Sequence, residues 1–317
     1  MHHTISYGKA RVPFYRVYAQ PLAGVAPIPE SPFTGRPNTL FAAEVDIEVF
    51  GDNFLPAYTE GDNSLVVATD SMKNFVLNQA LAYEGATLEG FLAHLGRLLL
   101  ATYPQMQSLR VTGRELPFGA VHVPSSGAAE TTAAFTASPV LYQRRHDDAA
   151  FATLDFARDG AEGGEGVRVS GHRCGRVGLE LLKVTGSAFT HFVRDSYTTL
   201  PERGDRPLFI TMDVFWRYTT TDDLLAPDHA RYVPAEQVRD LVSTVFHEFV
   251  SESIQHLVHE MGQRALARFP QLAEISFAAQ NHTPDPVAVS ANDPKLKVYS
   301  TPFPAYGLIT LTLARDA

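Results

Sequence analysis

The sequence predicts an α+β fold made of two similar halves, each with antiparallel strands covered on one face by helices. In both halves, segments with strand-like alternation come first, segments with helical spacing follow, and strand-like segments return. The helical segments carry a single apolar stripe, which is typical of a helix that packs on a sheet. We therefore expect a tandem duplication of one sheet-and-helix unit.

The first half carries most of its strand signals at its two ends. Strand-like alternation is found at residues 5–18, 41–50, 108–118 and 133–145. A proline-rich loop at 20–38 separates the first two strands. The short apolar run Leu65–Ala68 predicts a further strand that ends at Thr69. Helical spacing begins at Ser71, and Gly85 and Thr87 indicate a break between two helices.

The second half repeats this order around a glycine-rich loop at 160–166. Pro234 is expected in the first turn of a helix, where proline is favoured. Apolar stripes predict two helices, one over 238–245 and one over 254–265. Strands are predicted at residues 152–160, 175–193, 207–219, 272–282 and 304–316.

Composition limits the class of partner. The 317 residues include 26 Lys and Arg against 35 Asp and Glu, giving a net charge of −9. This balance argues against a nucleic-acid or anionic-membrane partner, while a local basic pocket for a small anion is still possible. The single cysteine, Cys174, excludes an intrachain disulfide and is expected to be a buried, inert thiol.

Targeting signals are also lacking in the sequence. We find no signal peptide, no apolar run long enough to cross a membrane, and no Ser-Lys-Leu peroxisomal ending after Arg315-Asp316-Ala317. We therefore expect a cytoplasmic protein of bacterial origin.

A polar cluster, Thr69-Asp70-Ser71 with Lys73, follows the apolar run at 65–68. Asp70 or Ser71 can cap the helix that starts there. A helix N-terminus also offers free N–H groups to an anion, so the cluster is compatible with a functional site as well.

The histidines do not predict a metal centre. His247, His256 and His259 fall in one helical region, but no His-Glu-x-x-His pattern or cysteine pair supports zinc. We expect these side chains to be solvated or partly buried. His282 differs, because "QNHT" at 280–283 places two amides and an imidazole at the end of a predicted strand; this is either an Asx-type turn or a cluster that handles protons.

Residues 183–206 combine Lys183 and three arginines with aromatic side chains. An aromatic ring and a guanidinium together suit a flat anionic ring, which they contact on its face and at its edge. An ion-pair network, such as Arg194 with Asp195 or Asp205, is the rival interpretation.

Four blocks of the sequence resemble the signature blocks of the urate oxidase (uricase) family. They are "YGKARV" at 7–12, "DNSLVVATDSMKN" at 62–74, "GSAFTHFVRDSYTTLPERGDR" at 186–206 and "PAYGLIT" at 304–310. The blocks run from one end of the chain to the other, and the third is long and specific. The resemblance implies tandem tunnelling-fold (T-fold) domains over 1–147 and 148–317, assembled as a homotetramer with active sites at subunit interfaces. It also implies oxidation of urate by dioxygen to 5-hydroxyisourate and hydrogen peroxide, without a metal or other cofactor.

The resemblance assigns a role to each matched position. Lys9 and Thr69 match the proton-relay pair, and His282 matches the catalytic histidine. Arg206 and Gln255 match the pair that holds urate, and Phe189 matches the residue that stacks on the ring. Minor pocket-lining positions fall on Asp70, Leu200, Ile254 and Ile309.

One position departs from the family pattern. Familiar members have an asparagine two residues before the histidine, where this chain has Gln280, and Asn281 is adjacent to His282. Thr69, Gln280 and Asn281 are therefore the candidates for the dioxygen site, and Asn281 is also a candidate for urate binding.

Two alternatives are compatible with the fold. Pterin and purine enzymes of the cyclohydrolase or aldolase type bind similar heterocycles, with a carboxylate anchor and often zinc. A non-catalytic urate-binding protein would keep the pocket for recognition alone. Arg206 and Gln255 argue against the first alternative, and the presence of Lys9 with Thr69 argues against the second.

Overall fold

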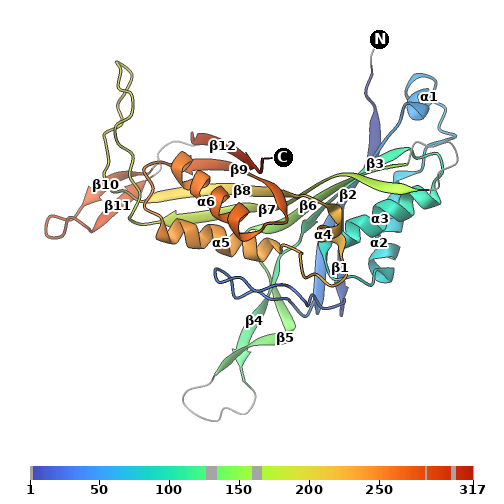
Figure 1. Ribbon diagram of the computed structural model, residues 1–317, viewed down its shortest axis with the longest axis horizontal. Coiled ribbons are helices and arrows are strands. Elements are labelled where there is room, and N and C mark those ends of the chain that lie inside the picture. The colour runs from blue at the N-terminus through green and yellow to red at the C-terminus, as the bar shows by residue number, and fades with distance from the viewer. Residues whose placement is uncertain (1–2, 126–133, 159–165, 283, 301–304, 317) are drawn as a thin grey trace. The chain divides into compact units, whose positions relative to one another are not determined.

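A computed structural model of the chain describes residues 3–125, 134–158, 166–282, 284–300 and 305–316 (Figure 1). The chain divides into two compact units. Unit 1 comprises Met1–Ala26, Thr34–Cys174 and Thr221–Tyr232, and unit 2 comprises Pro27–Phe33, Gly175–Thr220 and Val233–Ala317. Strand β7 (Val167–Lys183) therefore contributes residues to both units.

Unit 1 is a sheet covered by two long helices. Its strands are β1 (Ser6–Val17), β2 (Leu40–Phe50), β3 (Ser108–Glu115) and β6 (Ala149–Arg158), in the order β1-β2-β3-β6-β7. The pairs β1–β2, β2–β3 and β3–β6 are antiparallel. The helical segments are η1 (Asp52–Phe54), α1 (Leu55–Thr59), α2 (Thr69–Ala82), α3 (Leu88–Thr102) and α4 (Thr221–Leu225). A hairpin of β4 (Phe118–Pro124) and β5 (Phe135–Arg144) completes the unit.

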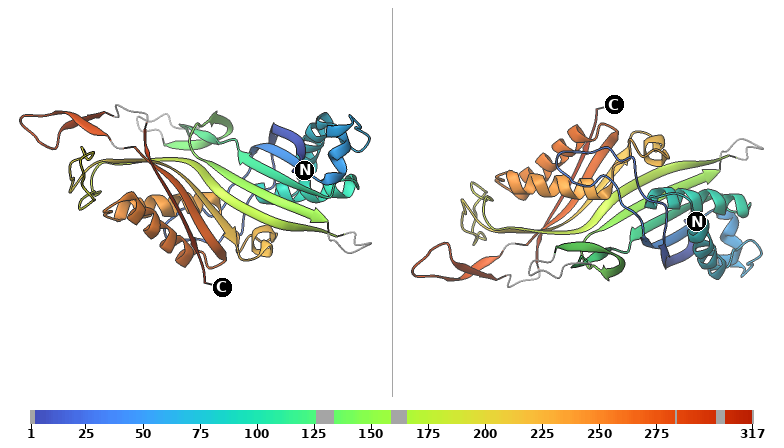
Figure 2. Two further views of the ribbon diagram at one scale, coloured as in Figure 1. Left: turned by 90° about the horizontal axis from the view of Figure 1, so that it is seen from above. Right: turned by 90° about the horizontal axis from the view of Figure 1, so that it is seen from below.

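Unit 2 has the same plan. Strands β8 (Leu208–Tyr218), β9 (Leu272–His282) and β12 (Gly307–Ala314) continue in the order β7-β8-β9-β12. The pairs β8–β9 and β9–β12 are antiparallel. Helices α5 (Ala235–Glu248) and α6 (Ile254–Arg268) lie beside each other on one face of these strands (Figure 2). The hairpin β10 (Asp285–Val289) and β11 (Lys297–Ser300) projects from the unit (Figure 1).

The core of each unit lies between its helices and its strands. In β2 the residues Val45, Ile47 and Val49 are buried and alternate with partly exposed neighbours, so one face of the sheet is apolar. The facing helix α3 buries Leu95 and Leu99 at helical spacing. Burial of such side chains stabilises the folded state by about 1.5–3 kcal/mol each.

The helix starts of the two units follow the same design. Helices α2 and α5 each have 14 residues, and α3 and α6 each have 15. The Thr87 hydroxyl accepts the Gly90 N–H at the start of α3, and the Ser253 hydroxyl accepts the His256 N–H at the start of α6, both at 3.1 Å. Each bond satisfies one of the free N–H groups at a helix start.

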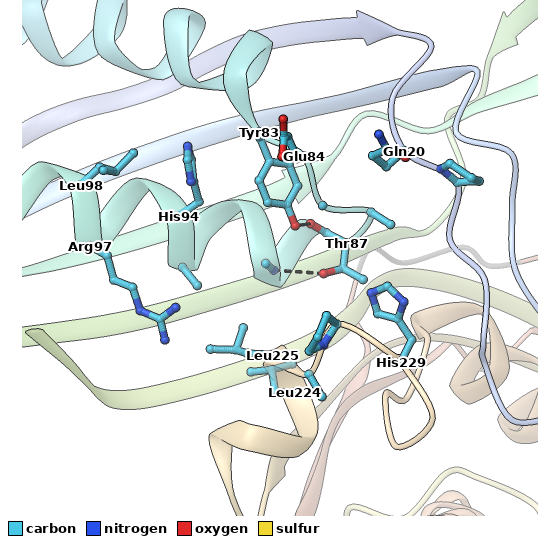
Figure 3. A pocket seen from close by; sticks show the side chains of 17 residues that line it. Gln20, Tyr83, Glu84, Thr87, His94, Arg97, Leu98, Leu224, Leu225 and His229 are labelled. Carbon is cyan, nitrogen blue, oxygen red and sulfur yellow. Dashed lines mark hydrogen bonds between the residues drawn. The ribbon is translucent and has the colours of Figure 1, made fainter.

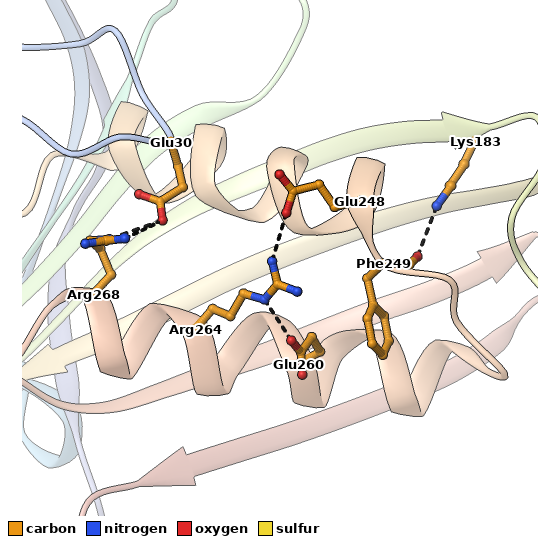
Figure 4. A network of polar contacts seen from close by, with 7 residues as sticks. All are labelled: Glu30, Lys183, Glu248, Phe249, Glu260, Arg264 and Arg268. Atoms are coloured by element: carbon orange, nitrogen blue, oxygen red, sulfur yellow. Dashed lines mark hydrogen bonds and ion pairs between the residues drawn. The ribbon is translucent and has the colours of Figure 1, made fainter.

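The helix ends are held by cations from neighbouring strands. Arg158 donates to the carbonyls of Leu100, Tyr103 and Met106 around the end of α3, and Arg315 donates to the carbonyls of Leu266, Phe269 and Leu272 around the end of α6. Arg16 donates to the Tyr83 carbonyl after α2, as Lys183 does to the Phe249 carbonyl after α5 (Figure 4). A cation at a helix C-terminus satisfies free carbonyls and complements the helix dipole.

Most predicted elements are present, but several predictions are wrong. Leu65–Ala68 is not a strand, because the Val67 N–H donates to the Tyr7 hydroxyl at 3.2 Å and not to a neighbouring strand. Helix α2 begins at Thr69 after the N-cap residue Ala68, so neither Asp70 nor Ser71 caps it.

Other differences concern the ends of elements and short elements. Residues 184–193 leave the predicted strand after Lys183 and form only isolated bridges. The segments α1, α4, β4, β10 and β11 were not predicted. The glycine-rich loop at 160–166 lies almost entirely outside the described residues. Cys174 is fully buried, as predicted, and burial raises the pKa of its thiol. In the part of the chain that the structure describes, no helix is long and apolar enough to cross a membrane.

Candidate active site

The segment between β7 and β8 in unit 2 brings Phe189 and Arg206 together. The Arg206 guanidinium carbon lies 5.4 Å from the centre of the Phe189 ring, and Phe192 stacks on that ring at 4.8 Å. Two backbone hydrogen bonds join Phe189 and Arg203, at 2.9 and 3.1 Å, and the Arg206 N–H donates to the Ser187 carbonyl at 2.9 Å. The aromatic side chain and the guanidinium are thus held by backbone contacts, as a fixed recognition site requires.

Arg206 is a buried cation without a carboxylate partner. Its exposed fraction is only 6%, and among the described residues its Nε has no hydrogen-bond acceptor and no carboxylate forms an ion pair with it. Burial and the neighbouring charge of Arg203 lower its pKa. A buried charge that lacks a partner is unfavourable, so this position is suited to an anionic ligand.

The start of α6 lies against the same segment. A parallel bridge joins Ser187 to Ser251, and the Ala188 N–H donates to the Ser251 carbonyl at 2.8 Å. Ile254 is buried in the first turn of α6, whereas Gln255 is exposed, so its amide is free to meet a ligand. Leu200, half-buried in the β7–β8 segment, accepts a hydrogen bond at its carbonyl from Arg194 at 3.3 Å.

The strand β9 ends with Gln280, Asn281 and His282, whose side chains point to alternating faces of the sheet. The His282 Nε2 lies 3.3 Å from the Thr211 hydroxyl, and Thr211 is the cross-strand neighbour of Gln280. Successive side chains of a strand point to opposite faces, so Gln280 shares a face with His282. Asn281 shares the other face with Ile309 of β12, and its buried Oδ1 lacks a hydrogen-bond partner among the described residues.

Unit 1 holds the other predicted residues. Lys9 is on β1, and Thr69 and Asp70 form the start of α2. Lys73 contacts Asp70 Oδ1 at 2.5 Å, and Asn74 donates to Oδ2 at 3.0 Å. The Lys73 ammonium lowers the pKa of Asp70, with a smaller contribution from the charge of Lys9, so Lys9 lies near this carboxylate.

The ion-pair interpretation of residues 183–206 fails for Arg194. Its guanidinium lies over the Phe192 ring at 5.5 Å and donates to a carbonyl. Asp205 accepts hydrogen bonds from the Thr185 hydroxyl and the Gly186 N–H, and Asp195 from the Tyr197 N–H and the Thr198 hydroxyl. These hydrogen bonds lower the pKa of both carboxyls.

Histidines on the second-half helices are solvated, as predicted. His247, His256 and His259 are exposed. Among the described residues, no group of three or more His, Cys, Asp or Glu side chains could hold a metal ion.

Two further features of the structure were not predicted. Arg203 pairs with Asp285 of β10 at 2.8 Å; only the density of arginines in 183–206 indicated a role for Arg203, and no sequence signal indicated its partner. The second feature is a cavity of about 610 Å³ in unit 1, beside the start of α3.

Figure 3 shows this cavity, which Tyr83, Thr87, His94, Arg97 and His229 line together with Leu224 and Leu225. Burial raises the pKa of Tyr83 to about 12 and lowers that of His94. None of the predicted site residues lines this cavity.

Comparisons with known proteins agree on one family. The uricase family profile matches residues 49–144 and 172–310. The uric acid degradation bifunctional protein PucL of Bacillus subtilis is 45% identical over 316 residues, which is 100% of this chain and 62% of PucL. A uricase from Halalkalicoccus jeotgali is 47% identical over 279 residues, 88% of each chain. A crystal structure of urate oxidase from Bacillus sp. TB-90 has a TM-score of 0.93 and 40% identity, and the match covers 98% of this chain and 100% of that one. This chain thus spans less than two thirds of PucL.

Proposed function

The chain belongs to the uricase family, and from this premise we propose that it oxidises urate with dioxygen to 5-hydroxyisourate and hydrogen peroxide. Two electrons pass from the purine ring to dioxygen, which leaves as hydrogen peroxide, and a water molecule supplies the new hydroxyl group. No metal or organic cofactor takes part in the proposed reaction. The observation that carries the proposal is the buried guanidinium of Arg206 above the Phe189 ring, without an anionic partner.

Recognition of urate is assigned to three residues of unit 2. Phe189 contacts the face of the ring, Arg206 binds the anionic edge with parallel hydrogen bonds, and Gln255 supplies both a donor and an acceptor. The proposed pocket lining also includes Asp70, Leu200, Ile254, Asn281 and Ile309.

Proton transfer is assigned to Lys9, Thr69 and His282. Urate must lose a second proton before its ring transfers electrons readily, so a lysine amine that acts together with a hydroxyl group is a suitable base. The Asp70 carboxylate is engaged by Lys73 and Asn74.

The dioxygen site is assigned to Thr69 and Gln280. Strand alternation supports Gln280 over Asn281, because Gln280 shares the face of His282. The glutamine thereby takes the position, two residues before the histidine, at which familiar members have an asparagine.

We also propose tandem T-fold domains over 1–147 and 148–317, assembled into a homotetramer. The repeated helix lengths and the repeated cation contacts at helix ends support the duplication. In the proposed assembly, Thr69 of one subunit meets Arg206 of another. Thr69→Ala and Arg206→Ala variants, each inactive alone, should regain part of the activity when they are refolded together. Mixed oligomers without activity would contradict the shared site.

The proposed activity is tested by incubating the purified chain with urate and oxygen. We expect the urate absorbance band to decrease and one hydrogen peroxide to form per urate consumed. Arg206→Met should abolish turnover, whereas Arg268→Met, which removes the cation that pairs with Glu30 at the end of α6 (Figure 4), should leave it unchanged. Urate that stays intact with the unmodified chain would refute the proposal.

A further inference from the structure

Two arginines, and not one, are withdrawn from water in the β7–β8 segment. The Arg203 side chain is 17% exposed and the Arg206 residue is 6% exposed. Both have a buried Nε without a hydrogen-bond partner among the described residues. The charge of Arg203 contributes to the lowered pKa of Arg206, so the two guanidinium groups lie close enough to repel each other. Such a pair is unfavourable unless a negative charge approaches it.

The nearby carboxylates compensate this charge only in part. Asp285 accepts from Arg203 Nη2 at 2.8 Å, but its side chain is 54% exposed, so water screens its charge. Asp205 is adjacent to Arg206 in sequence, yet its oxygens accept from Thr185 and Gly186. The buried side of the segment therefore keeps a positive potential.

Backbone contacts connect Arg203 to the ring-stacking residue. The Phe189 N–H donates to the Arg203 carbonyl at 2.9 Å, and the Arg203 N–H donates to the Phe189 carbonyl at 3.1 Å. A change in the position of Arg203 would therefore move Phe189, and the hairpin that carries Asp285 holds the Arg203 guanidinium from the other side.

We propose that Arg203 is a second recognition cation of the urate site, which selects the anionic form of the purine, and that Asp285 orients its guanidinium. This inference rests on the proposed function. In this proposal Arg206 makes the direct contacts with the ligand. The positive charge of Arg203 adds an electrostatic attraction that stabilises a bound anion and not a bound neutral purine. The role is one of specificity and affinity, so it concerns KM and not the chemical step.

The test measures urate binding by titration calorimetry in the absence of oxygen. Turnover is measured separately in air. Arg203→Met should weaken urate binding about tenfold, because it removes a positive charge close to the bound anion, while kcat at saturating urate stays within about threefold. Arg203→Lys keeps the charge and should stay within about threefold of the unmodified affinity. Asp285→Asn keeps an acceptor but removes a negative charge, so binding should be as tight as, or tighter than, in the unmodified chain. Arg268→Met, which breaks another 2.8 Å ion pair of unit 2, is the matched control and should bind normally.

Each outcome either supports or overturns the proposed role of Arg203. Unchanged affinity in Arg203→Met overturns the inference, as does an Arg203→Lys variant that is as weak as Arg203→Met, because the side chain would then act by shape alone. If Arg203→Met does not fold, as judged by circular dichroism, the affinities of Asp285→Asn and Arg203→Lys decide whether the inference holds. Weakened urate binding in Asp285→Asn would contradict a role for the positive charge of Arg203. Failure of the unmodified chain to bind urate would refute the proposed function itself and is seen in the first titration.

Discussion

Replacement of Arg206 by methionine should make the protein more stable and nearly unable to bind urate. The Arg206 residue is 6% exposed, and its guanidinium lacks an acceptor for its Nε within the described residues and is repelled by Arg203. A buried charge without a partner costs several kcal/mol, part of which its remaining contact with water offsets. The guanidinium carbon of Arg206 lies 5.4 Å from the centre of the Phe189 ring. A methionine at this position should keep an apolar contact with that ring. We therefore expect the free energy of unfolding without ligand to rise by about 1–3 kcal/mol.

The assay is thermal unfolding with and without urate under nitrogen, because oxygen would consume the ligand. Without urate, the variant should unfold about 2–4 °C higher for each kcal/mol gained. Saturating urate should raise the Tm of the unmodified chain, since a ligand that binds only the folded state stabilises it, and should leave the Tm of the variant unchanged. Arg268→Met is the control, because it removes an ion-paired arginine of α6 and should lower stability slightly. If Arg206→Met unfolds below the unmodified chain without urate, Arg206 supports the fold and the reasoning is wrong.

Three further predictions concern catalysis and stability. Lys9→Met should lower kcat by at least about 100-fold with anaerobic urate affinity within about threefold, because it removes a base and not a recognition group; near-normal turnover would exclude Lys9 as the base. Gln280→Ala should lower kcat more than Asn281→Ala does, since only Gln280 shares the face of His282, and steady-state kinetics with peroxide detection would show the reverse order if the assignment is wrong. Arg158→Met and Arg315→Met should each lower the free energy of unfolding by about 2–4 kcal/mol in urea titrations, because each leaves three carbonyls at a helix end without their donor; a loss below about 0.5 kcal/mol would show that water replaces the guanidinium.

Strand and helix positions were predictable where a long periodic pattern faces a core. The strand β9 runs from Leu272 to His282, as the alternation of apolar residues predicts, because Ile275, Phe277 and Ala279 are buried at every second position. The same logic fails for Leu65–Ala68. Four apolar residues are enough to suggest a strand, but here Val67 alone is buried and its N–H bonds to a tyrosine hydroxyl. A short apolar run carries no information about whether a strand partner exists.

The candidate site was predictable in its residue types and not in its pairing. The arginines and aromatics of 183–206 indicated an anion site, and resemblance to a family assigned the individual roles. That Arg206 lacks a partner while Arg203 has Asp285 depends on a hairpin more than 80 residues away in sequence. Helix capping at Asp70 was a reasonable local prediction, but the carboxylate is bound by Lys73 and Asn74 in place of the backbone.

The matching contacts at the helix ends bear on how freely each half can change. Thr87 and Ser253 occupy equivalent caps, but the residue two positions later is the buried Glu89 in one half and the exposed Gln255 in the other. If Gln255 contacts urate as proposed, this position serves folding in one half and recognition in the other. A saturation library should therefore accept many replacements at Gln255 that fold but lose turnover, and at Glu89 should lose folding and turnover together. On the proposed assignment, Gln255 is thus a position where substrate preference can be changed at little cost in stability.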